Sequence, residues 1–246
     1  MNRIKMSVLA ASPDLETEKT ASAKTNLIQR KQIRESHVNE FSFFLPLHYE
    51  PNYAYPLIVW LHSDGHSANQ IQQVMLEMSL RNYVGVGVCS SVGNPQSGFC
   101  WDQEWDTIDL AYNSVTTAIE NTQQRCQINS RKIFLAGAGS GGTMAFRLAF
   151  SRPDLFAGVL SIDGQLPATD TPLLDWEKCR SIPIFWAHDN HSPEFSQTQL
   201  CQQLKLLYVA GFKVKLCQYR KIEMPCSVVF SDANQWIMET IDSAVF

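Results

Sequence analysis

The stretch Arg131–Pro167, RKIFLAGAGSGGTMAFRLAFSRPDLFAGVLSIDGQLP, decides the fold. Its apolar run Ile133–Gly137 predicts a buried strand, and Thr143–Ser151 predicts a helix. A glycine-rich turn, Gly137–Gly142, connects the two. Small residues are needed at such a turn because the strand and the following helix cross closely. The stretch therefore predicts a strand–turn–helix unit with a strained turn.

Predicted strands and helices alternate on both sides of this unit. Further strands are expected at residues 27–36, 38–47, 57–62, 83–88, 157–162, 182–188 and 213–219, and further helices at residues 69–81, 108–126, 197–210 and 231–241. Residues 89–106 are expected to form a loop. The alternation predicts an α/β protein: a mostly parallel twisted sheet with helices on both faces and an antiparallel N-terminal edge. Residues 1–26 are polar and predict a disordered tail before a domain that spans residues 27–246.

Composition excludes several classes of protein. The 246 residues are 45% hydrophobic and 18% charged, which is typical of a globular chain. A net charge of −4 without a basic face argues against nucleic acid as a partner. No apolar run approaches the roughly 20 residues of a membrane-spanning helix. The apolar run near the N-terminus is too short for a signal peptide.

Cysteine spacing and the metal-binding residue types argue against disulfides, a metal site and a cofactor. The seven cysteines are widely spaced and contain no C-x-x-C pair, which argues against a disulfide framework or a zinc site. We therefore expect a reducing compartment and a cytoplasmic protein. His62, Asp64 and His66 lack a fourth metal ligand, and the glycine-rich turn lies too far along the chain for a dinucleotide site. We expect neither a cofactor nor a metal.

Several motifs together resemble one family. They are the turn GAGSGG at 137–142, SRPDLFAG at 151–158, PLIVWLH at 56–62, IPIFWAH at 182–188 and LLYVAGFKVKLCQY at 206–219. They resemble the carboxylesterase and phospholipase branch of the α/β-hydrolases, including polyhydroxybutyrate-depolymerase-like and feruloyl-esterase-like proteins. The resemblance covers the chain from about residue 40 onward. It implies an α/β-hydrolase fold, a nucleophile elbow at the turn, and ester hydrolysis by a serine–acid–histidine triad.

The triad positions that the resemblance implies carry other residue types. The family's Gly-Phe-Ser-Gln-Gly-Gly falls on residues 137–142, which places Gly139 at the nucleophile and Ser140 one residue later. The acid position falls on Ser192, and the histidine position falls near Glu223. A carboxylate cannot replace an imidazole as a base near neutral pH without a large pKa shift. Ser140 is expected either to cap the following helix or, in a shifted register, to act as a nucleophile.

The residues expected around an oxyanion site or pocket come from several loops: Ser63, Asp64, Trp101, Trp105, Ser140 and His188. Asp64 either places a negative charge where an oxyanion would form or is a solvated turn residue. Trp101 and Trp105 either line a ligand cleft or fill it. An open cleft favours ligand binding, and a filled one favours a structural role.

These observations lead to a hypothesis with two alternatives. The sequence predicts a catalytically inactive α/β-hydrolase that binds a small acyl-like or ester-like ligand or a protein partner. The first alternative is a weak or rewired serine ester hydrolase that uses Ser140 with His188 or His191. The second is a purely structural or interaction subunit.

Overall fold

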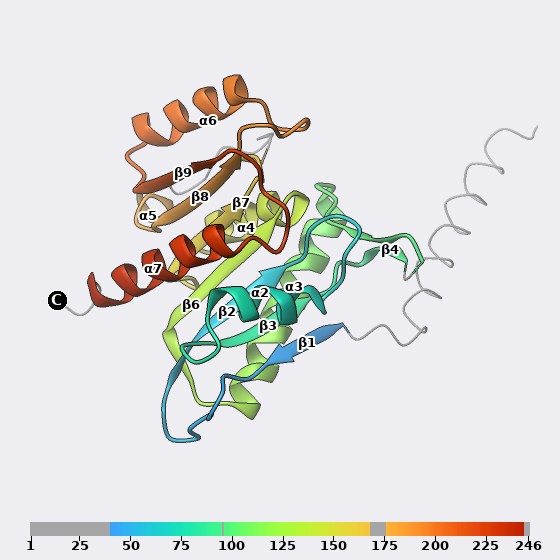
Figure 1. The fold of residues 1–246 in the computed structure, drawn as a ribbon, viewed down its shortest axis with the longest axis vertical. Helices are drawn as coiled ribbons and strands as arrows, with labels where there is room; N and C mark the ends of the chain where they lie inside the picture. The colour runs from blue at the N-terminus through green and yellow to red at the C-terminus, as the bar shows by residue number, and fades with distance from the viewer. Residues whose placement is uncertain (1–39, 95, 168–175, 244–246) are drawn as a thin grey trace, which may run out of the picture. The chain divides into compact units, whose positions relative to one another are not determined.

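A seven-stranded sheet forms the centre of the computed structural model, which describes residues 40–94, 96–167 and 176–243 (Figure 1). The strand order is β1-β3-β2-β6-β7-β8-β9. The strands are β1 (Phe41–Phe44), β2 (Tyr55–Leu61), β3 (Val84–Val88), β6 (Ile128–Ala138), β7 (Gly158–Ile162), β8 (Ile184–Asp189) and β9 (Val214–Tyr219). Strand β1 runs antiparallel to β3, and the other neighbours in this sheet are parallel. The predicted parallel sheet with an antiparallel N-terminal edge is confirmed.

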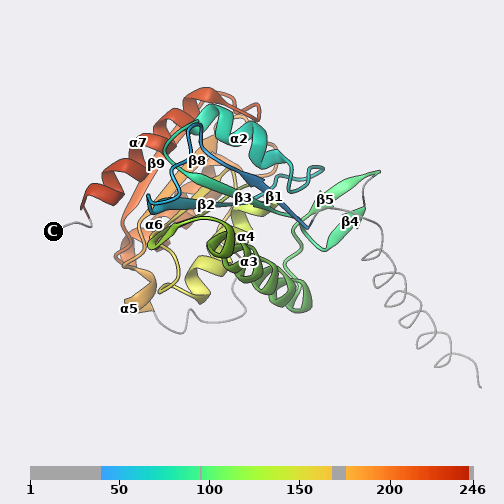
Figure 2. The same cartoon turned by 90° about the horizontal axis from the view of Figure 1, so that it is seen from below.

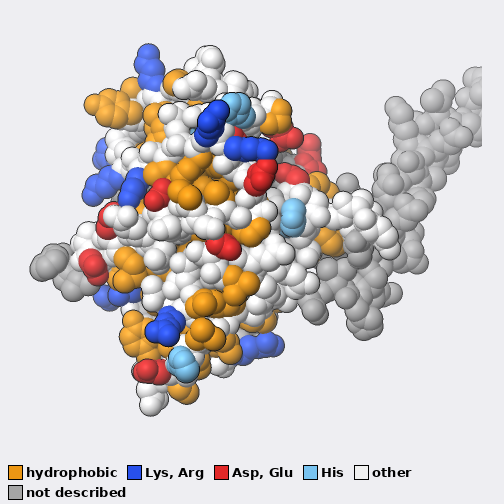
Figure 3. All heavy atoms as spheres, viewed as in Figure 1, with side chains coloured by type: hydrophobic (Ala, Val, Ile, Leu, Met, Phe, Trp, Pro, Cys, Tyr) orange, Lys and Arg blue, Asp and Glu red, His pale blue; other side chains and the backbone are white. Residues whose placement is uncertain are grey.

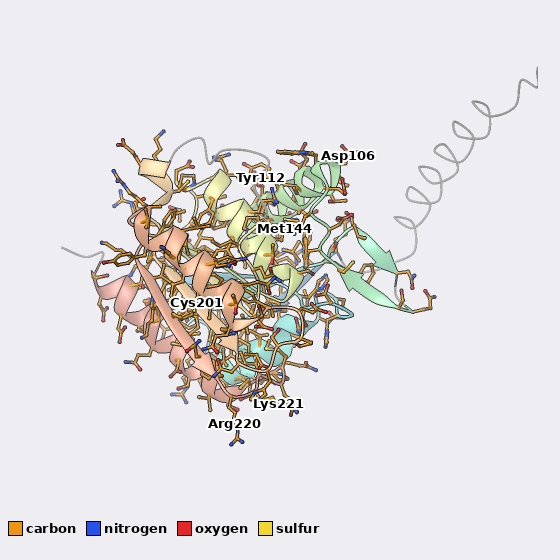
Figure 4. The ribbon with its side chains drawn as sticks, turned by 90° about the horizontal axis from the view of Figure 1, so that it is seen from above. Asp106, Tyr112, Met144, Cys201, Arg220 and Lys221 are labelled. Carbon is orange, nitrogen blue, oxygen red and sulfur yellow. The ribbon has the colours of Figure 1, made fainter. Side chains whose placement is uncertain are left out.

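Helices cover both faces of the sheet (Figure 2). They are α2 (Gln70–Met78), α3 (Trp105–Arg125), α4 (Ser140–Ser151), α5 (Trp176–Cys179), α6 (Gln197–Val209) and α7 (Ser227–Ser243). Buried residues of α3, α4 and α6 join one apolar core, and those of α2 and α7 join a second core on the opposite face. In Figure 4, the labelled Asp106 of α3 and Lys221 of the β9–α7 connection lie on opposite sides of the molecule.

The predicted tail 1–26 and the predicted strand 27–36 lie outside the described residues. The chain divides into two compact units, residues 1–38 and residues 39–246, and every described residue belongs to the second. No helix in the described ranges combines the length and apolarity needed to cross a bilayer.

The structure corrects the expected loop at 89–106, because a two-stranded antiparallel hairpin lies within it. Strands β4 (Val92–Asn94) and β5 (Gly98–Cys100) form this hairpin. The Asn94 side chain accepts the main-chain N–H groups of the turn, and Phe99 bridges to His66. Each strand has only three residues, so no alternating apolar pattern marked them. The hairpin matters for the site because β5 leads directly into Trp101.

Candidate functional site

The turn after β6 is a sharp strand-to-helix elbow with Gly139 at its tip. Gly139 has φ +57° and ψ −126°, a conformation that side-chain-bearing residues adopt only under strain. Its N–H donates to the Ile162 carbonyl at the end of β7, 2.9 Å away. Helix α4 begins at the next residue, Ser140. The elbow therefore places Gly139, which has no side chain, at the tip and Ser140 in the first turn of the helix.

Close packing between α4 and β2 explains the glycines that follow. A Cβ on Gly141 would lie 2.5 Å from the carbonyl oxygens of Leu61 and His62. A Cβ on Gly137 would lie 2.4 Å from the Gly141 carbonyl oxygen. Helix α4 could not pack this closely against the strands with larger residues at these positions.

The Ser140 hydroxyl is held by a carboxylate. It donates to Asp64 Oδ1 at 2.6 Å, and the Ser140 N–H donates to Asp64 Oδ2 at 3.2 Å. The hydroxyl oxygen also accepts the Trp101 N–H at 3.0 Å. No histidine in the described part of the chain hydrogen-bonds this hydroxyl. The expected capping by Ser140 is absent, since the side chain bonds to the neighbouring loop instead of to its own helix.

Asp64 reaches Ser140 because of the register between β2 and β6. Leu61 pairs with Gly137, so Asp64 and Ser140, each three residues further on, lie at the same edge of the sheet. In an esterase elbow, the N–H of the residue after the nucleophile binds the anionic oxygen of the reaction intermediate. At Ser140, this N–H already donates to Asp64. A negative carboxylate at the N-terminus of α4 is also favoured by the helix dipole.

The second expected oxyanion donor, the Ser63 N–H, is also occupied. It donates to Gln70 Oε1 at 2.9 Å, and Gln70 Nε2 donates to the Ser63 hydroxyl at 2.7 Å. The Trp60 indole N–H donates to the same Gln70 oxygen at 2.9 Å. Gln70 was not among the site residues predicted from the sequence. The sequence signal for Gln70 was its spacing: it lies four positions before Val74 and so falls on the buried face of the predicted helix.

His62 is a buried, neutral structural residue. Its Nε2 accepts the Ser90 N–H at 3.1 Å, so Nδ1 carries the proton and donates to the Ser63 carbonyl at 3.0 Å. Burial lowers the pKa of His62 below its ordinary value of 6.5. The Trp101 indole N–H donates to the His62 carbonyl oxygen at 3.0 Å, and the two rings lie 5.2 Å apart.

The lowered pKa of His62 predicts a loss of stability in mild acid. The folded chain binds this proton less readily than the unfolded chain does. The free energy of unfolding should therefore fall as the pH drops below about 6.5. The change is at most about 1.4 kcal/mol per pH unit. Urea unfolding at about pH 7.5 and about pH 5.5 measures this change. In the His62→Asn variant the dependence should be weaker, and an equal dependence in both proteins would contradict the assignment.

The two tryptophans of the predicted pocket have different surroundings. Trp101 is 4% exposed and belongs to the core on the α3–α4 face. Trp105, the first residue of α3, is 58% exposed. Only Trp101 hydrogen-bonds Ser140, through its main-chain N–H. Trp101 is thus part of the packing beneath the elbow.

The end of β8 holds a buried histidine beside an aspartate. His188 is fully buried, packs against the Phe195 ring and has Nδ1 3.3 Å from Asp163 Oδ1. Burial raises the pKa of the Asp163 carboxyl, while a hydrogen bond from Ser192 opposes this shift. Ser192, at the expected acid position, also accepts the Phe195 N–H at 3.2 Å. Ser192, at the acid position that the resemblance implies, thus bonds to its own loop and to Asp163.

The loop after β9 carries no imidazole at the expected histidine position. Glu223 is exposed and forms an ion pair with Lys221. Asp189, at the end of β8, accepts the N–H groups of His191 at 2.8 Å and Ile222 at 2.9 Å. The carboxylate of Asp189 thus ties the two loops together. The face that carries α7 shows interspersed acidic, basic and apolar side chains (Figure 3).

Metal-binding residue types do not gather in the ranges that the structure describes. No group of three or more His, Cys, Asp or Glu side chains there could hold a metal ion. His66 Nδ1 instead contacts the Ser63 hydroxyl and the Asp64 carbonyl, each at 3.1 Å.

Comparison with known proteins assigns the family. The family model described as "Putative esterase" matches residues 36–211, and the chain belongs to this family. It is also 27% identical over 144 residues to a protein named "Putative esterase NocK" from Nocardia uniformis subsp. tsuyamanensis. That match covers 56% of this chain, and the chain spans only 40% of the relative's length.

Solved structures share the fold at low sequence identity. The Bacillus cereus carboxylesterase matches with a TM-score of 0.66 and 13% identity, covering 86% of this chain and 99% of that one. Zea mays acyl-protein thioesterase 2 matches with a TM-score of 0.62 and 15% identity, covering 83% of this chain and 100% of that one. Arabidopsis thaliana SOBER1 matches with a TM-score of 0.62 and 18% identity, covering 76% of this chain and 100% of that one. These likenesses confirm the α/β-hydrolase fold.

Proposed function

We propose that this chain is a catalytically inactive member of the esterase family that binds a ligand or a protein partner at the carboxyl ends of its strands. One observation carries the proposal: Asp64 accepts both the hydroxyl and the N–H of Ser140. The only serine of the elbow and a main-chain N–H that an esterase needs for its oxyanion are thereby engaged. Loss of one essential triad member alone costs roughly 10⁴–10⁶ in kcat.

Three further features support the proposal. Gly139 lies at the tip of the elbow with φ +57° and has no nucleophilic side chain. The Ser63 N–H donates to Gln70 and is not free to bind an oxyanion. Ser192 and Glu223, at the acid and histidine positions of the resemblance, bond to Phe195 and Lys221.

We expect the purified protein to form no covalent adduct with a fluorophosphonate, because this reagent needs a serine that a neighbouring base has activated. Intact-mass spectrometry measures the adduct, and an active serine esterase labelled in the same tube confirms that the reagent works. Circular dichroism confirms that the chain is folded. A stoichiometric adduct that disappears in Ser140→Ala would contradict the proposal.

The same experiment tests the alternative of a weak ester hydrolase that uses Ser140. The 2.6 Å bond to Asp64 favours this alternative, since a carboxylate is a proton acceptor, although a weak one near neutral pH. His188 and His191 offer less support as bases. His188 is fully buried against Phe195, and His191 Nδ1 contacts the Arg220 carbonyl.

The ligand and the compartment are also part of the proposal. A small acyl-like or ester-like molecule suits the fold, and a protein partner suits a site in which Trp101 is packed into the core. The seven cysteines are widely spaced and contain no C-x-x-C pair, which supports a reducing, cytoplasmic location.

A further inference from the structure

The Asp64 carboxylate lies where an esterase elbow would bind an anion. Its Oδ2 accepts the first N–H of α4, and its Oδ1 accepts the Ser140 hydroxyl. A Cβ on Gly139 would lie 3.0 Å from Oδ2, so the carboxylate is next to the space that a nucleophilic side chain would need. The chain therefore supplies its own anion to this position.

The loop that carries Asp64 is held in place. The Gly65 N–H donates to the Phe99 carbonyl at 2.9 Å, and the Phe99 N–H donates to the His66 carbonyl at 3.2 Å. These bonds tie the loop to strand β5, and the His66 N–H closes it with a bond to the Ser63 carbonyl. An exposed aspartate on an unanchored loop would exchange its partners with water, but this loop is attached on both sides of Asp64.

A second carboxylate, Asp102, acts on the same neighbouring thiol as Asp64. Burial, Asp64 and Asp102 together raise the pKa of the Cys100 thiol, so both carboxylates act on the same neighbouring group. Asp102 makes no bond to Ser140. It accepts the Glu104 N–H at 3.3 Å instead. Asp102 therefore provides a matched control, because it is a nearby negative charge that makes no contact with Ser140.

We propose that Asp64 is a specificity-determining residue that excludes anions from the elbow, so the ligands that bind there are uncharged or cationic. This inference rests on the proposed binding function and adds the class of ligand to it. A carboxylate or a tetrahedral anion would lose the Ser140 N–H as a partner and would be repelled by a charge a few ångströms away. An uncharged ester, an alcohol or an amine carries no such penalty.

Titration with sodium butanoate tests the inference, with the amide resonance of Ser140 in ¹⁵N-labelled protein as the readout. We expect no saturable shift in the wild type or in Asp102→Asn. In Asp64→Gly the amide loses its internal partner, and butanoate should bind at least about tenfold more tightly. Asp64→Asn removes the charge at nearly the same size and serves as the second variant if Asp64→Gly does not fold.

Either of two results would overturn the inference. One is saturable binding of butanoate at the Ser140 amide in the wild type, as tight as in the Asp64 variants. The other is no gain in binding in folded Asp64→Gly or folded Asp64→Asn. Fluorophosphonate labelling separates this inference from the proposed function. An adduct on wild-type Ser140 overturns the inactivity, whereas the butanoate titration alone decides the role of Asp64.

Discussion

Replacing Gly141 by alanine is expected to cost about 3 kcal/mol or more of the free energy of unfolding. The new methyl carbon would lie 2.5 Å from two carbonyl oxygens, those of Leu61 at the end of β2 and of His62 directly after it. Neither oxygen can move away easily, because both belong to the main chain of fully buried residues. Helix α4 would have to shift away from the sheet. A loss of this size is a large fraction of the whole stability of a typical domain, about 5–15 kcal/mol.

Urea unfolding followed by circular dichroism measures this loss, and Gly65→Ala provides the matched control. Gly65 has φ +78° but no atom within 4 Å of its added Cβ, so its substitution tests backbone strain without overlap. We expect Gly65→Ala to cost only about 1–2 kcal/mol. Equal losses in the two variants would show that the close crossing of α4 and β2 does not govern stability.

Replacing Trp101 by alanine is expected to cost about 3–5 kcal/mol and to loosen the elbow. Trp101 is 4% exposed, and its indole N–H is the donor to the His62 carbonyl. Its removal leaves a cavity beneath Ser140 and takes the donor away from that buried carbonyl. Its main-chain N–H bond to the Ser140 hydroxyl would weaken as the backbone relaxes into the cavity.

Two variants calibrate the effect of Trp101→Ala in the same urea-unfolding measurement. Trp101→Phe keeps most of the ring but not the N–H, and we expect a loss of about 1–3 kcal/mol. Trp105→Ala removes a tryptophan that is 58% exposed, and we expect a change within about 0.5 kcal/mol. A loss in Trp101→Ala as small as that in Trp105→Ala would contradict the structural role of Trp101.

The predicted elements came close to the observed ones wherever the pattern was local. The apolar run 57–62 became β2, and the apolar run 133–137 became the buried end of β6. Helix α4 begins at Ser140, three residues before the predicted start at 143. Its first turn contains Gly141 and Gly142, which are poor helix formers. Tertiary packing against β2 stabilises the helix there and overrides the propensity.

The candidate site was less accessible to sequence reasoning than the fold. That residue 139 is a glycine and that residues 220–246 contain no histidine can be read from residue types alone, whereas their place in a triad is only what the resemblance implies. The partners of Ser140 cannot be read from residue types, because Asp64 lies 76 residues away along the chain. Gln70, which accepts the Ser63 N–H, was hidden among the polar residues of the helix 69–81.

The amino-acid sequence by itself determined the kind of sheet, the position of the elbow and the residue types at its tip. These depend on apolar periodicity and on glycine, and both are local signals. Only the tertiary structure decided that Asp64 binds Ser140, that Gln70 binds Ser63 and that Trp101 packs beneath the elbow. The physical reason is the parallel register of β2 and β6. It brings loops that are far apart along the chain to one edge of the sheet, where a buried acceptor such as Gln70 finds donors from other elements.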